Sequence, residues 1–259
     1  MIEVKRVSKS YSKGKYWFRE DNQTVLKEIT FTVEAGECVG LVGESGSGKS
    51  TLSRIITGLE KADKGDVLID RKVVPEWRKE NKGRMSIVFQ DYASSVNPNF
   101  TVKEIISEPL LALGQKNDRI EIINELLEKF RLTKSLLNRY PHEISGGQLQ
   151  RVCLLRAIST SPRFLVLDEA LSALDAPTQS QLLELLTRIK RESRVTYLFI
   201  THDILSAVKL CDRILFLYKG EIVEQIATNQ LAYVQHEYSK KLLHSVANVI
   251  FQENKRGVF

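Results

Sequence analysis

The sequence predicts an α/β fold in which a mostly parallel β-sheet is covered on both faces and interrupted by a helical insert. Three observations support this prediction. A glycine-rich segment follows a short apolar run and precedes a helical pattern. Short apolar runs typical of buried strands recur along the chain and alternate with helical patterns. From about residue 101 to 157, however, the apolar residues follow helical spacing instead.

The glycine-rich segment reads Gly43-Glu44-Ser45-Gly46-Ser47-Gly48-Lys49-Ser50 and matches G-x-x-x-x-G-K-[ST], the phosphate-binding loop of nucleotide hydrolases. Residues 38–42 predict the strand before it, and residues 51–56 predict the first turns of the helix after it. The glycines allow successive backbone N–H groups to face phosphate oxygens, and the helix N-terminus adds partial positive charge. A serine-rich surface turn is the alternative, and both flanking patterns oppose it.

The motif predicts a role for each residue of the loop. We expect residues 43–51, up to Thr51, to surround the phosphates of a nucleotide. Lys49 would meet the β- and γ-phosphates, and the Ser50 hydroxyl would bind Mg²⁺.

Composition limits the class of protein. The chain has 259 residues, 42% hydrophobic and 27% charged, as is usual for a globular domain. No apolar stretch is long enough to span a bilayer and no signal peptide begins the chain, so we expect it to be cytosolic.

The net charge of +6 comes from scattered residues without a basic stripe, which disfavours a nucleic-acid partner. Cys38, Cys153 and Cys211 lie in or beside apolar runs and predict buried, reduced thiols.

Apolar runs and helical spacing predict the remaining elements. Strands are expected at residues 2–6 and 25–33, with a long hairpin loop over residues 12–23 between them. Further strands are expected at residues 67–70, 85–89, 164–167, 195–200 and 214–218. Helices are expected over residues 120–130 and around residues 182–189.

Two acids, Asp168 and Glu169, follow the apolar run at residues 164–167. Ligands of open α/β sheets bind at the carboxyl ends of the strands, so both carboxylates are expected beside the nucleotide. Asp168 would hold Mg²⁺ through water, and Glu169 would polarise the attacking water. The alternative is a strand that ends in two solvated acids.

A second phosphate-binding pattern occurs in Ile144-Ser145-Gly146-Gly147-Gln148, just before a helical pattern that starts near Leu149. At these residues the chain resembles the nucleotide-binding subunits of ATP-binding-cassette (ABC) transporters, whose signature reads L-S-G-G-Q, with Ile144 in place of the leucine. The resemblance implies a P-loop NTPase core of RecA-like fold, with an antiparallel β subdomain and an inserted α-helical subdomain. It also implies that Ser145, Gly146, Gly147 and Gln148 cap ATP held by an opposing subunit.

The resemblance implies roles for four further positions. Gln90 matches the Q-loop glutamine, whose amide reaches Mg²⁺ and the attacking water. Asp175, in Ser172-Ala173-Leu174-Asp175, matches the D-loop that couples the two ATP sites. His202 matches the switch histidine that contacts the γ-phosphate. Tyr11 is placed like the aromatic residue that stacks on adenine, and Tyr16, Trp17 or Phe18 could replace it because stacking needs only a π-face.

The resemblance covers nearly the whole chain and implies one nucleotide-binding domain over residues 1–259. Residues 1–90 and 158–235 would form the RecA-like core with the antiparallel β subdomain. Residues 91–157 would form the helical subdomain, and residues 236–259 a C-terminal extension.

Two segments resemble the peptide/nickel import branch of the family. Residues 90–98 are similar to Q-D-P-x-x-S-L-N-P, and residues 236–243 are similar to H-P-Y-T-x-x-L-L, with Glu237 in place of the proline. Residues 145–154 are more similar to nickel-importing than to oligopeptide-importing members. The resemblance thus implies an ATP- and Mg²⁺-dependent ATPase of a metal or metal-chelate importer, with a peptide importer as the alternative.

The implied partners are a second ABC ATPase subunit, usually a different chain in that branch, two transmembrane permease subunits and an extracytoplasmic substrate-binding protein. The implied location is the cytoplasmic face of the cell membrane. Two alternatives from other classes are a soluble cassette protein acting on nucleic acid or ribosomes, and a module that binds ATP without turnover. The absence of a long coiled coil or second cassette disfavours the first, and the presence of Glu169 and His202 disfavours the second.

Overall fold

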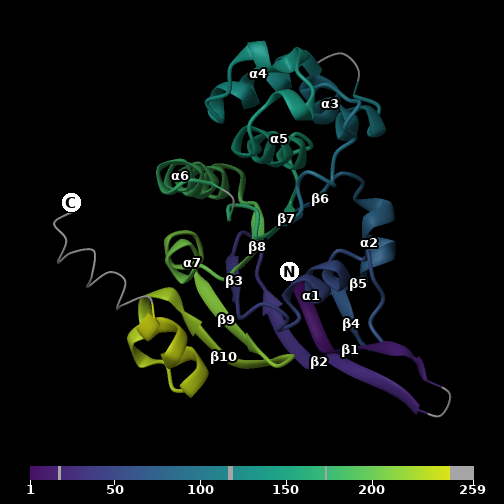
Figure 1. The fold of residues 1–259 in the computed structure, drawn as a ribbon, viewed down its shortest axis with the longest axis vertical. Coiled ribbons are helices and arrows are strands. Elements are labelled where there is room, and N and C mark those ends of the chain that lie inside the picture. Colours follow the sequence, from purple (N-terminus) through teal and green to yellow (C-terminus); the bar gives the residue numbers. More distant parts are fainter. Residues whose placement is uncertain (17–18, 116–118, 173, 246–259) are drawn as a thin grey trace.

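The computed structural model describes residues 1–16, 19–115, 119–172 and 174–245, which form two β-sheets and a group of helices (Figure 1). A six-stranded sheet has the order β10-β9-β3-β8-β7-β6, and a four-stranded sheet has the order β2-β1-β4-β5. In the larger sheet all neighbouring strands run parallel except the edge strand β10, which is antiparallel to β9. The smaller sheet is antiparallel throughout. The predicted mostly parallel sheet is therefore confirmed.

The strands are β1 (Ile2–Tyr16), β2 (Arg19–Val33), β3 (Cys38–Val42), β4 (Lys64–Ile69), β5 (Lys72–Val73), β6 (Met85–Val88), β7 (Phe164–Asp168), β8 (Thr196–Thr201), β9 (Arg213–Tyr218) and β10 (Glu221–Ala227). The α-helices are α1 (Lys49–Ile56), α2 (Val74–Glu80), α3 (Val102–Ala112), α4 (Arg119–Lys129), α5 (Gly146–Ile158), α6 (Ala176–Ser193) and α7 (Ile204–Leu210). The 3₁₀ helices are η1 (Lys134–Asn138), η2 (Pro141–Glu143) and η3 (Thr228–Tyr233). A further helix covers residues 237–245.

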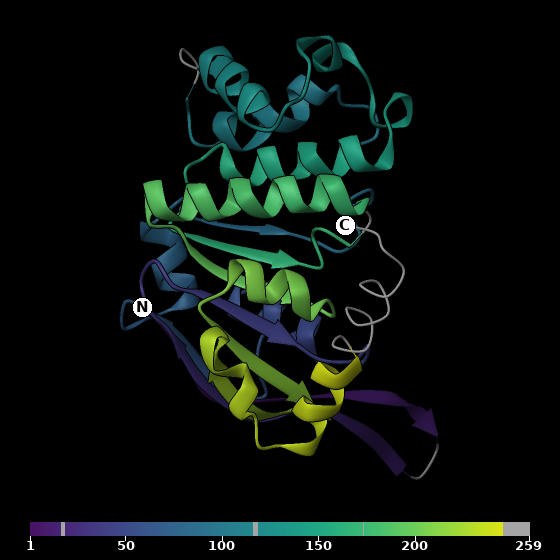
Figure 2. The ribbon, with the colours of Figure 1, turned by 90° about the vertical axis from the view of Figure 1, so that its left-hand side faces the viewer.

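The larger sheet is buried on both faces, which explains its continuous apolar runs. Along β7, Leu165 and Leu167 join a core with α5, α6 and α7, whereas Phe164 and Val166 join a second core with the smaller sheet and α1. Successive side chains of a strand point to opposite faces, so each strand contributes to both cores in turn. Figures 1 and 2 show α5, α6 and α7 on one side of this sheet, and α1 with the antiparallel sheet on the other.

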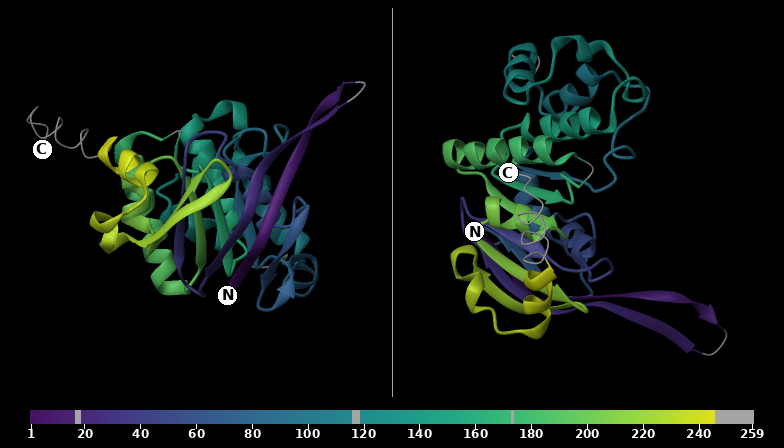
Figure 3. Two further views of the ribbon diagram at one scale, coloured as in Figure 1. Left: turned by 90° about the horizontal axis from the view of Figure 1, so that it is seen from below. Right: turned by 60° about the vertical axis from the view of Figure 1, so that its left-hand side comes forward.

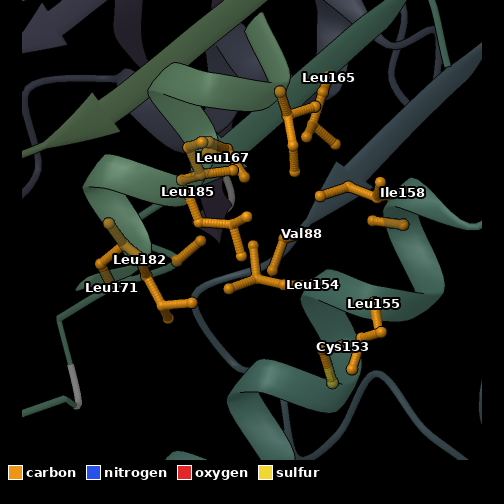
Figure 4. Packing of buried hydrophobic residues seen from close by; sticks show 14 of the residues in the cluster. Val88, Cys153, Leu154, Leu155, Ile158, Leu165, Leu167, Leu171, Leu182 and Leu185 are labelled. Atoms are coloured by element: carbon orange, nitrogen blue, oxygen red, sulfur yellow. The ribbon is translucent and has the colours of Figure 1, made fainter. Parts of the chain in front are cut away.

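Helix α5 links the helical segment to the sheet. In Figure 4, Leu154 of α5 lies among Val88 at the end of β6, Leu167 of β7 and Leu185 of α6. All four side chains are buried in one core. The helix carrying the second glycine motif is therefore packed directly against the strand that ends in the two acids.

The hairpin between residues 2 and 33 differs from the prediction. Strands β1 and β2 run much further than expected, with Ser10 paired to Thr24 and Ser12 to Asn22, so the predicted loop over residues 12–23 is wrong (Figure 3). Strand pairing uses backbone hydrogen bonds, which polar residues form as well as apolar ones. A ribbon that extends beyond the core lacks the apolar alternation by which a sequence reveals a strand.

Several short elements were not expected from the sequence, among them α2, α7 and β10. Helices α2 and α7 have only seven residues each, too few to show a helical period. Strand β10 carries Glu221 and Glu224 and lies at the sheet edge, where one side is open to solvent.

The three cysteines are buried and free, as predicted. Although far apart in sequence, Cys38 and Cys211 place their sulfur atoms 3.3 Å apart between β3 and the end of α7. In the described part of the chain, no helix combines the length and apolar character needed to cross a bilayer.

Candidate nucleotide site

The glycine-rich loop connects β3 to α1 in the arrangement that its sequence predicts. Its backbone adopts positive φ angles at Gly46 (79°) and Gly48 (108°), which residues with side chains rarely adopt. At Gly43, a Cβ atom would lie 2.3 Å from the carbonyl oxygen of Leu217 in β9. The loop therefore needs glycine for two reasons, backbone conformation at Gly46 and Gly48 and close backbone contact at Gly43.

Replacing Gly43 by alanine is expected to displace the loop and destabilise the fold. The added methyl group would overlap a strand backbone, which has little room to move, at a cost of about 1–3 kcal/mol of unfolding free energy. Gly46→Ala is the matched control, because a Cβ there would meet no atom of the described residues within 4 Å beyond its chain neighbours, and only φ strain of about 1–2 kcal/mol remains. Denaturant unfolding with ATP titration measures both effects. Retention of full ATP affinity in Gly43→Ala would contradict the close-contact argument.

Lys49 lies at the first position of α1 and is folded back across the loop. Its ammonium nitrogen donates to the carbonyl oxygens of Gly43 at 2.7 Å and Glu44 at 2.9 Å, and only 5% of its side chain is exposed. Burial lowers the pKa of Lys49, while the carboxylates of Glu169, 3.9 Å away, and of Asp168 act in the opposite direction. A buried cation held by two carbonyl groups is suited to transfer onto an anion that enters the loop.

Asp168 ends strand β7 and faces the start of α1. Its two carboxylate oxygens accept hydrogen bonds from the hydroxyls of Ser50 at 3.3 Å and Ser53 at 3.0 Å. Burial raises the pKa of Asp168, and the nearby Glu169 charge acts in the same direction, while the serine hydrogen bonds and Lys49 oppose the rise. A cation bound beside Asp168 would offset the burial of its charge.

Asp168→Asn is expected to stabilise the nucleotide-free chain at neutral pH. The native pKa of Asp168 is raised, so its carboxyl favours folding most below its unfolded pKa, and this contribution is lost as the pH rises through the native value. Asparagine does not titrate in this range. The stability of the variant should therefore fall less than that of the parent as the pH rises from the unfolded to the native pKa of Asp168. Unfolding in denaturant from pH 4 to pH 8 measures this, with exposed Asp66→Asn as the control. A variant less stable than parent at pH 8 would contradict the argument.

Glu169 lies one residue beyond Asp168 and collects three polar partners. Gln90 donates its amide N–H to Glu169 Oε2 at 3.1 Å, and His202 Nδ1 lies 3.3 Å from the same oxygen. Lys49 approaches the other carboxylate oxygen. The backbone of Glu169 has a positive φ of 48° and its N–H donates to Ile200 O at 2.9 Å, which turns the chain sharply at the end of β7. Residues from four separate segments thus meet at one carboxylate.

These groups line one cavity of about 580 Å³ beside the loop. It is lined by Gln23, Val25, Ser45, Gly46, Gly48, Lys49, Ser50, Thr51, Gln90, Glu169 and His202. The structure therefore brings together the loop, Gln90, Glu169 and His202, as the sequence suggested. Gln23 and Val25 of β2 were not anticipated, because their contribution depends on how the hairpin crosses the loop.

Tyr11 lies near the cavity but does not line it. Its hydroxyl donates to Glu60 Oε1 at 2.6 Å and lies 3.5 Å from Thr51 Oγ1, and the Lys9 ammonium lies 5.5 Å from its ring centre. Its side chain is partly exposed. The alternatives Trp17 and Phe18, and the side chain of Tyr16, lie outside the described part of the structure.

The second glycine motif does not line this cavity. Ser145 begins α5, accepting a hydrogen bond from Gln148 N at 3.2 Å, while the Gln148 side chain accepts from Ser145 N at 2.9 Å. A Cβ at Gly146 would lie 2.8 Å from the Tyr92 hydroxyl, so the turn is closely packed. Asp175 similarly begins α6, accepting from Thr178 N at 3.4 Å. A helix N-terminus left outside the cavity of its own chain is available to a ligand held elsewhere.

The phosphate-binding loop and the end of β7 also fit Mg²⁺. Among the described residues, no group of three or more histidine, cysteine or acidic side chains could hold a metal ion alone. Mg²⁺, however, is commonly bound by one or two protein oxygens together with substrate phosphates. The Ser50 hydroxyl and the Asp168 carboxylate lie together at the loop, and the buried Ser47 hydroxyl there has no hydrogen-bond partner within the described part of the chain. The paired oxygens of Ser50 and Asp168 suit a hard cation accompanied by phosphate.

Comparison with known sequences agrees with this geometry. The sequence profile of the family described as "ABC transporter" matches residues 26–172, more than half of the chain. The chain belongs to the ABC transporter family. This ABC protein is 39% identical to the metal-staphylopine import system ATP-binding protein CntF of Staphylococcus aureus (strain NCTC 8325 / PS 47), over 94% of this chain and 98% of that protein. It is also 39% identical to the nickel import ATP-binding protein NikE of Rhodospirillum rubrum, over 95% of this chain and 91% of that protein.

The fold of this ABC protein matches that of solved cassettes. A dimeric, post-hydrolysis structure of the ATP-binding cassette MJ0796 with ADP and phosphate aligns with a TM-score of 0.79 and 30% identity. The alignment covers 88% of this chain and 99% of that one. The predicted P-loop NTPase fold and the predicted ATP-hydrolysing activity are thus confirmed, and the chain is an ATP-binding ATPase of an ABC transporter.

Proposed function

We propose that this ABC ATPase powers the import of a transition metal ion or metal chelate. The observation that carries the proposal is the identity of 39% with both CntF and NikE over more than nine-tenths of the chain, since both are named for metal import. The cassette does not select the cargo, because substrate is chosen by membrane and extracellular subunits. The proposal therefore concerns the transporter in which this chain works.

The proposed hydrolysis uses the groups that line the cavity. Lys49 leaves the carbonyl oxygens of Gly43 and Glu44 and binds the β- and γ-phosphates of ATP. Glu169 accepts a proton from the attacking water, which Gln90 helps to orient. His202, whose exposed ring lies beside Glu169, donates to the γ-phosphate. The four groups act by holding the reacting atoms in position and by stabilising the developing charge.

Ser50, Gln90 and Asp168 would hold Mg²⁺, which supplies charge neutralisation at the phosphates when bound. Glu44, Ser45, Gly46, Ser47, Gly48 and Thr51 would surround the phosphates with backbone N–H groups and hydroxyls. Tyr11 would stack on adenine, for which its partly exposed ring is suited. Its hydroxyl is already held by Glu60, so binding would need only the ring face.

We further propose that ATP is bound between two cassettes. The Ser145-Gly146-Gly147-Gln148 turn would cap a nucleotide held by the partner cassette, and Asp175 would couple the two sites. Support comes from the position of this turn outside the chain's own cavity. The remaining proposed partners are a second ATPase chain, two permease subunits and an extracytoplasmic binding protein, with this subunit at the cytoplasmic face of the membrane. The division into residues 1–90 with 158–235, 91–157 and 236–259 is part of this proposal, and residues 246–259 of the extension lie outside the described structure.

The cargo is tested in the source cell with Lys49→Ala against parent. Accumulated nickel, cobalt, zinc and iron are measured in metal-poor medium, and sensitivity to a toxic peptide is scored in parallel. We expect the variant to lose metal while peptide sensitivity stays unchanged. Unchanged metal with acquired peptide resistance would instead assign the chain to a peptide importer and leave the ATPase mechanism intact.

A further inference from the structure

The C-terminal helix contacts the phosphate-binding loop through one side chain. Tyr238 lies in the helix at residues 237–245 and is only 6% exposed. Its ring stacks on Tyr218 at the end of β9, with ring centres 4.2 Å apart and planes inclined by 26°. Its hydroxyl oxygen accepts a hydrogen bond from the backbone N–H of Glu44 at 2.9 Å. A residue 194 positions away in the sequence therefore binds the loop backbone directly.

This contact completes the support of one peptide group. The peptide between Gly43 and Glu44 presents its carbonyl oxygen to Lys49 at 2.7 Å and its N–H to Tyr238 at 2.9 Å. The orientation of a peptide plane is set by its two polar groups when both are hydrogen-bonded. The first peptide of the loop is thus held from both sides, by a side chain of the loop and by one from the C-terminal helix.

The two supports are not equivalent. In the proposed mechanism Lys49 moves from the carbonyl oxygen to the nucleotide phosphates, so the peptide loses that partner when ATP binds. The Tyr238 hydroxyl has no such second task. It can keep this peptide, and with it the Gly43 carbonyl oxygen that releases Lys49, in one orientation throughout the cycle.

We propose that Tyr238 is a positioning residue of the nucleotide site, whose hydroxyl holds the Gly43–Glu44 peptide in the orientation that phosphate binding requires. This inference rests on the proposed role of Lys49. It gives the helix at residues 237–245 a role in supporting the phosphate-binding loop, in addition to the support that β3 and α1 provide. Tyr238 acts through the loop backbone and does not touch the reacting atoms.

The position of Tyr238 is set from β10. The Glu224 carboxylate accepts hydrogen bonds from the backbone N–H groups of Gln235 at 2.6 Å and His236 at 3.3 Å. The ring nitrogen Nδ1 of His236 accepts from Tyr238 N at 3.1 Å, which caps the first turn of the helix. Although burial opposes it, these backbone hydrogen bonds help to hold the pKa of Glu224 below its usual range. The helix is therefore anchored to the edge strand of the sheet before it reaches the loop.

The test compares Tyr238→Phe with Tyr218→Phe in the full chain. The first removes the hydroxyl that binds Glu44 and keeps the stacked ring, whereas the second removes the other hydroxyl of the same ring pair. Loss of one hydrogen bond should raise the KM for ATP of Tyr238→Phe by about three- to tenfold, with a smaller change in kcat. Hydrogen exchange of the Glu44 amide, followed by NMR, should accelerate by a similar factor of about three to ten. Tyr218→Phe should match parent in both measurements.

The outcomes separate this inference from the proposed function. If parent hydrolyses ATP and Tyr238→Phe matches it in KM and in Glu44 exchange, the inference is overturned while the ATPase mechanism stands. Equal effects of the two variants would also overturn it, because the ring pair and not the Tyr238 hydroxyl would then matter. Glu224→Gln, which keeps Tyr238 and weakens its anchor, is expected to shift KM and Glu44 exchange in the same direction as Tyr238→Phe. Glu44 exchange needs no turnover, so it tests the contact even if Lys49→Ala retains full ATP affinity and the proposed role of Lys49 fails.

Discussion

Replacing Glu169 by glutamine is expected to lower the rate of ATP hydrolysis by about 10²–10⁴-fold while ATP still binds. Glutamine has the shape of glutamate, but its amide cannot accept a proton from water at neutral pH. Glu169 is also the one carboxylate that Gln90, His202 and Lys49 all approach in the described part of the structure. Removal of its charge therefore ends general-base action without removing the groups that bind phosphate.

Phosphate release and ATP binding by calorimetry measure the two effects in Glu169→Gln separately. Glu221→Gln is the control, because this glutamate forms an exposed ion pair with Lys27 away from the cavity. ATP bound without hydrolysis should also favour the two-cassette complex, which gel filtration with the partner subunit would detect. Turnover of Glu169→Gln at the parent rate would show that another group removes the proton from water.

Replacing Lys49 by methionine is expected to lower kcat/KM for ATP by about 10²-fold or more and to abolish the rise in melting temperature that ATP causes. Methionine fills a similar volume without charge, so the lost interaction is that between the ammonium and the phosphates. Burial already lowers the pKa of Lys49, which means that the protonated side chain is costly in the empty loop. The nucleotide-free variant loses this cost together with the hydrogen bonds to Gly43 and Glu44, so the ATP-induced rise, and not the melting temperature of the empty protein, reports phosphate binding.

Thermal unfolding with and without ATP checks the Lys49→Met prediction. Lys27→Met serves as the control, since Lys27 lies on the surface and pairs only with Glu221 among the described residues. A variant with a lowered melting temperature but an unchanged ATP-induced rise would show that Lys49 supports the loop and does not bind the phosphates.

Much of the site could be predicted because its parts are local in sequence. The segment Gly43–Ser50 follows β3, and the acids Asp168 and Glu169 lie at the end of β7. Both strands are buried on both faces, and such strands appear as continuous apolar runs. In a parallel sheet these strands end at the same edge, so their meeting follows from topology. Gln90 and His202 follow β6 and β8 in the same way and reach the same carboxylate.

Other features depend on contacts between distant segments, which leave no periodic pattern. The extended pairing of β1 and β2 uses backbone groups that any residue supplies, so the sequence suggested a loop over residues 12–23 instead. The cavity wall formed by Gln23 and Val25 depends on where that ribbon crosses the phosphate loop. Likewise, nothing local to Tyr238 indicates that its hydroxyl binds the loop backbone at Glu44.

The amino-acid sequence was sufficient for the fold class, the ATPase chemistry and most of the cavity residues, because glycine conformation, strand burial and charge at strand ends are local properties. The tertiary structure was needed to show that the Ser145–Gln148 turn lies outside its own chain's cavity, that Cys38 and Cys211 meet, and that β10 anchors the helix bearing Tyr238. These are long-range contacts, and their partners are chosen by packing of the whole chain.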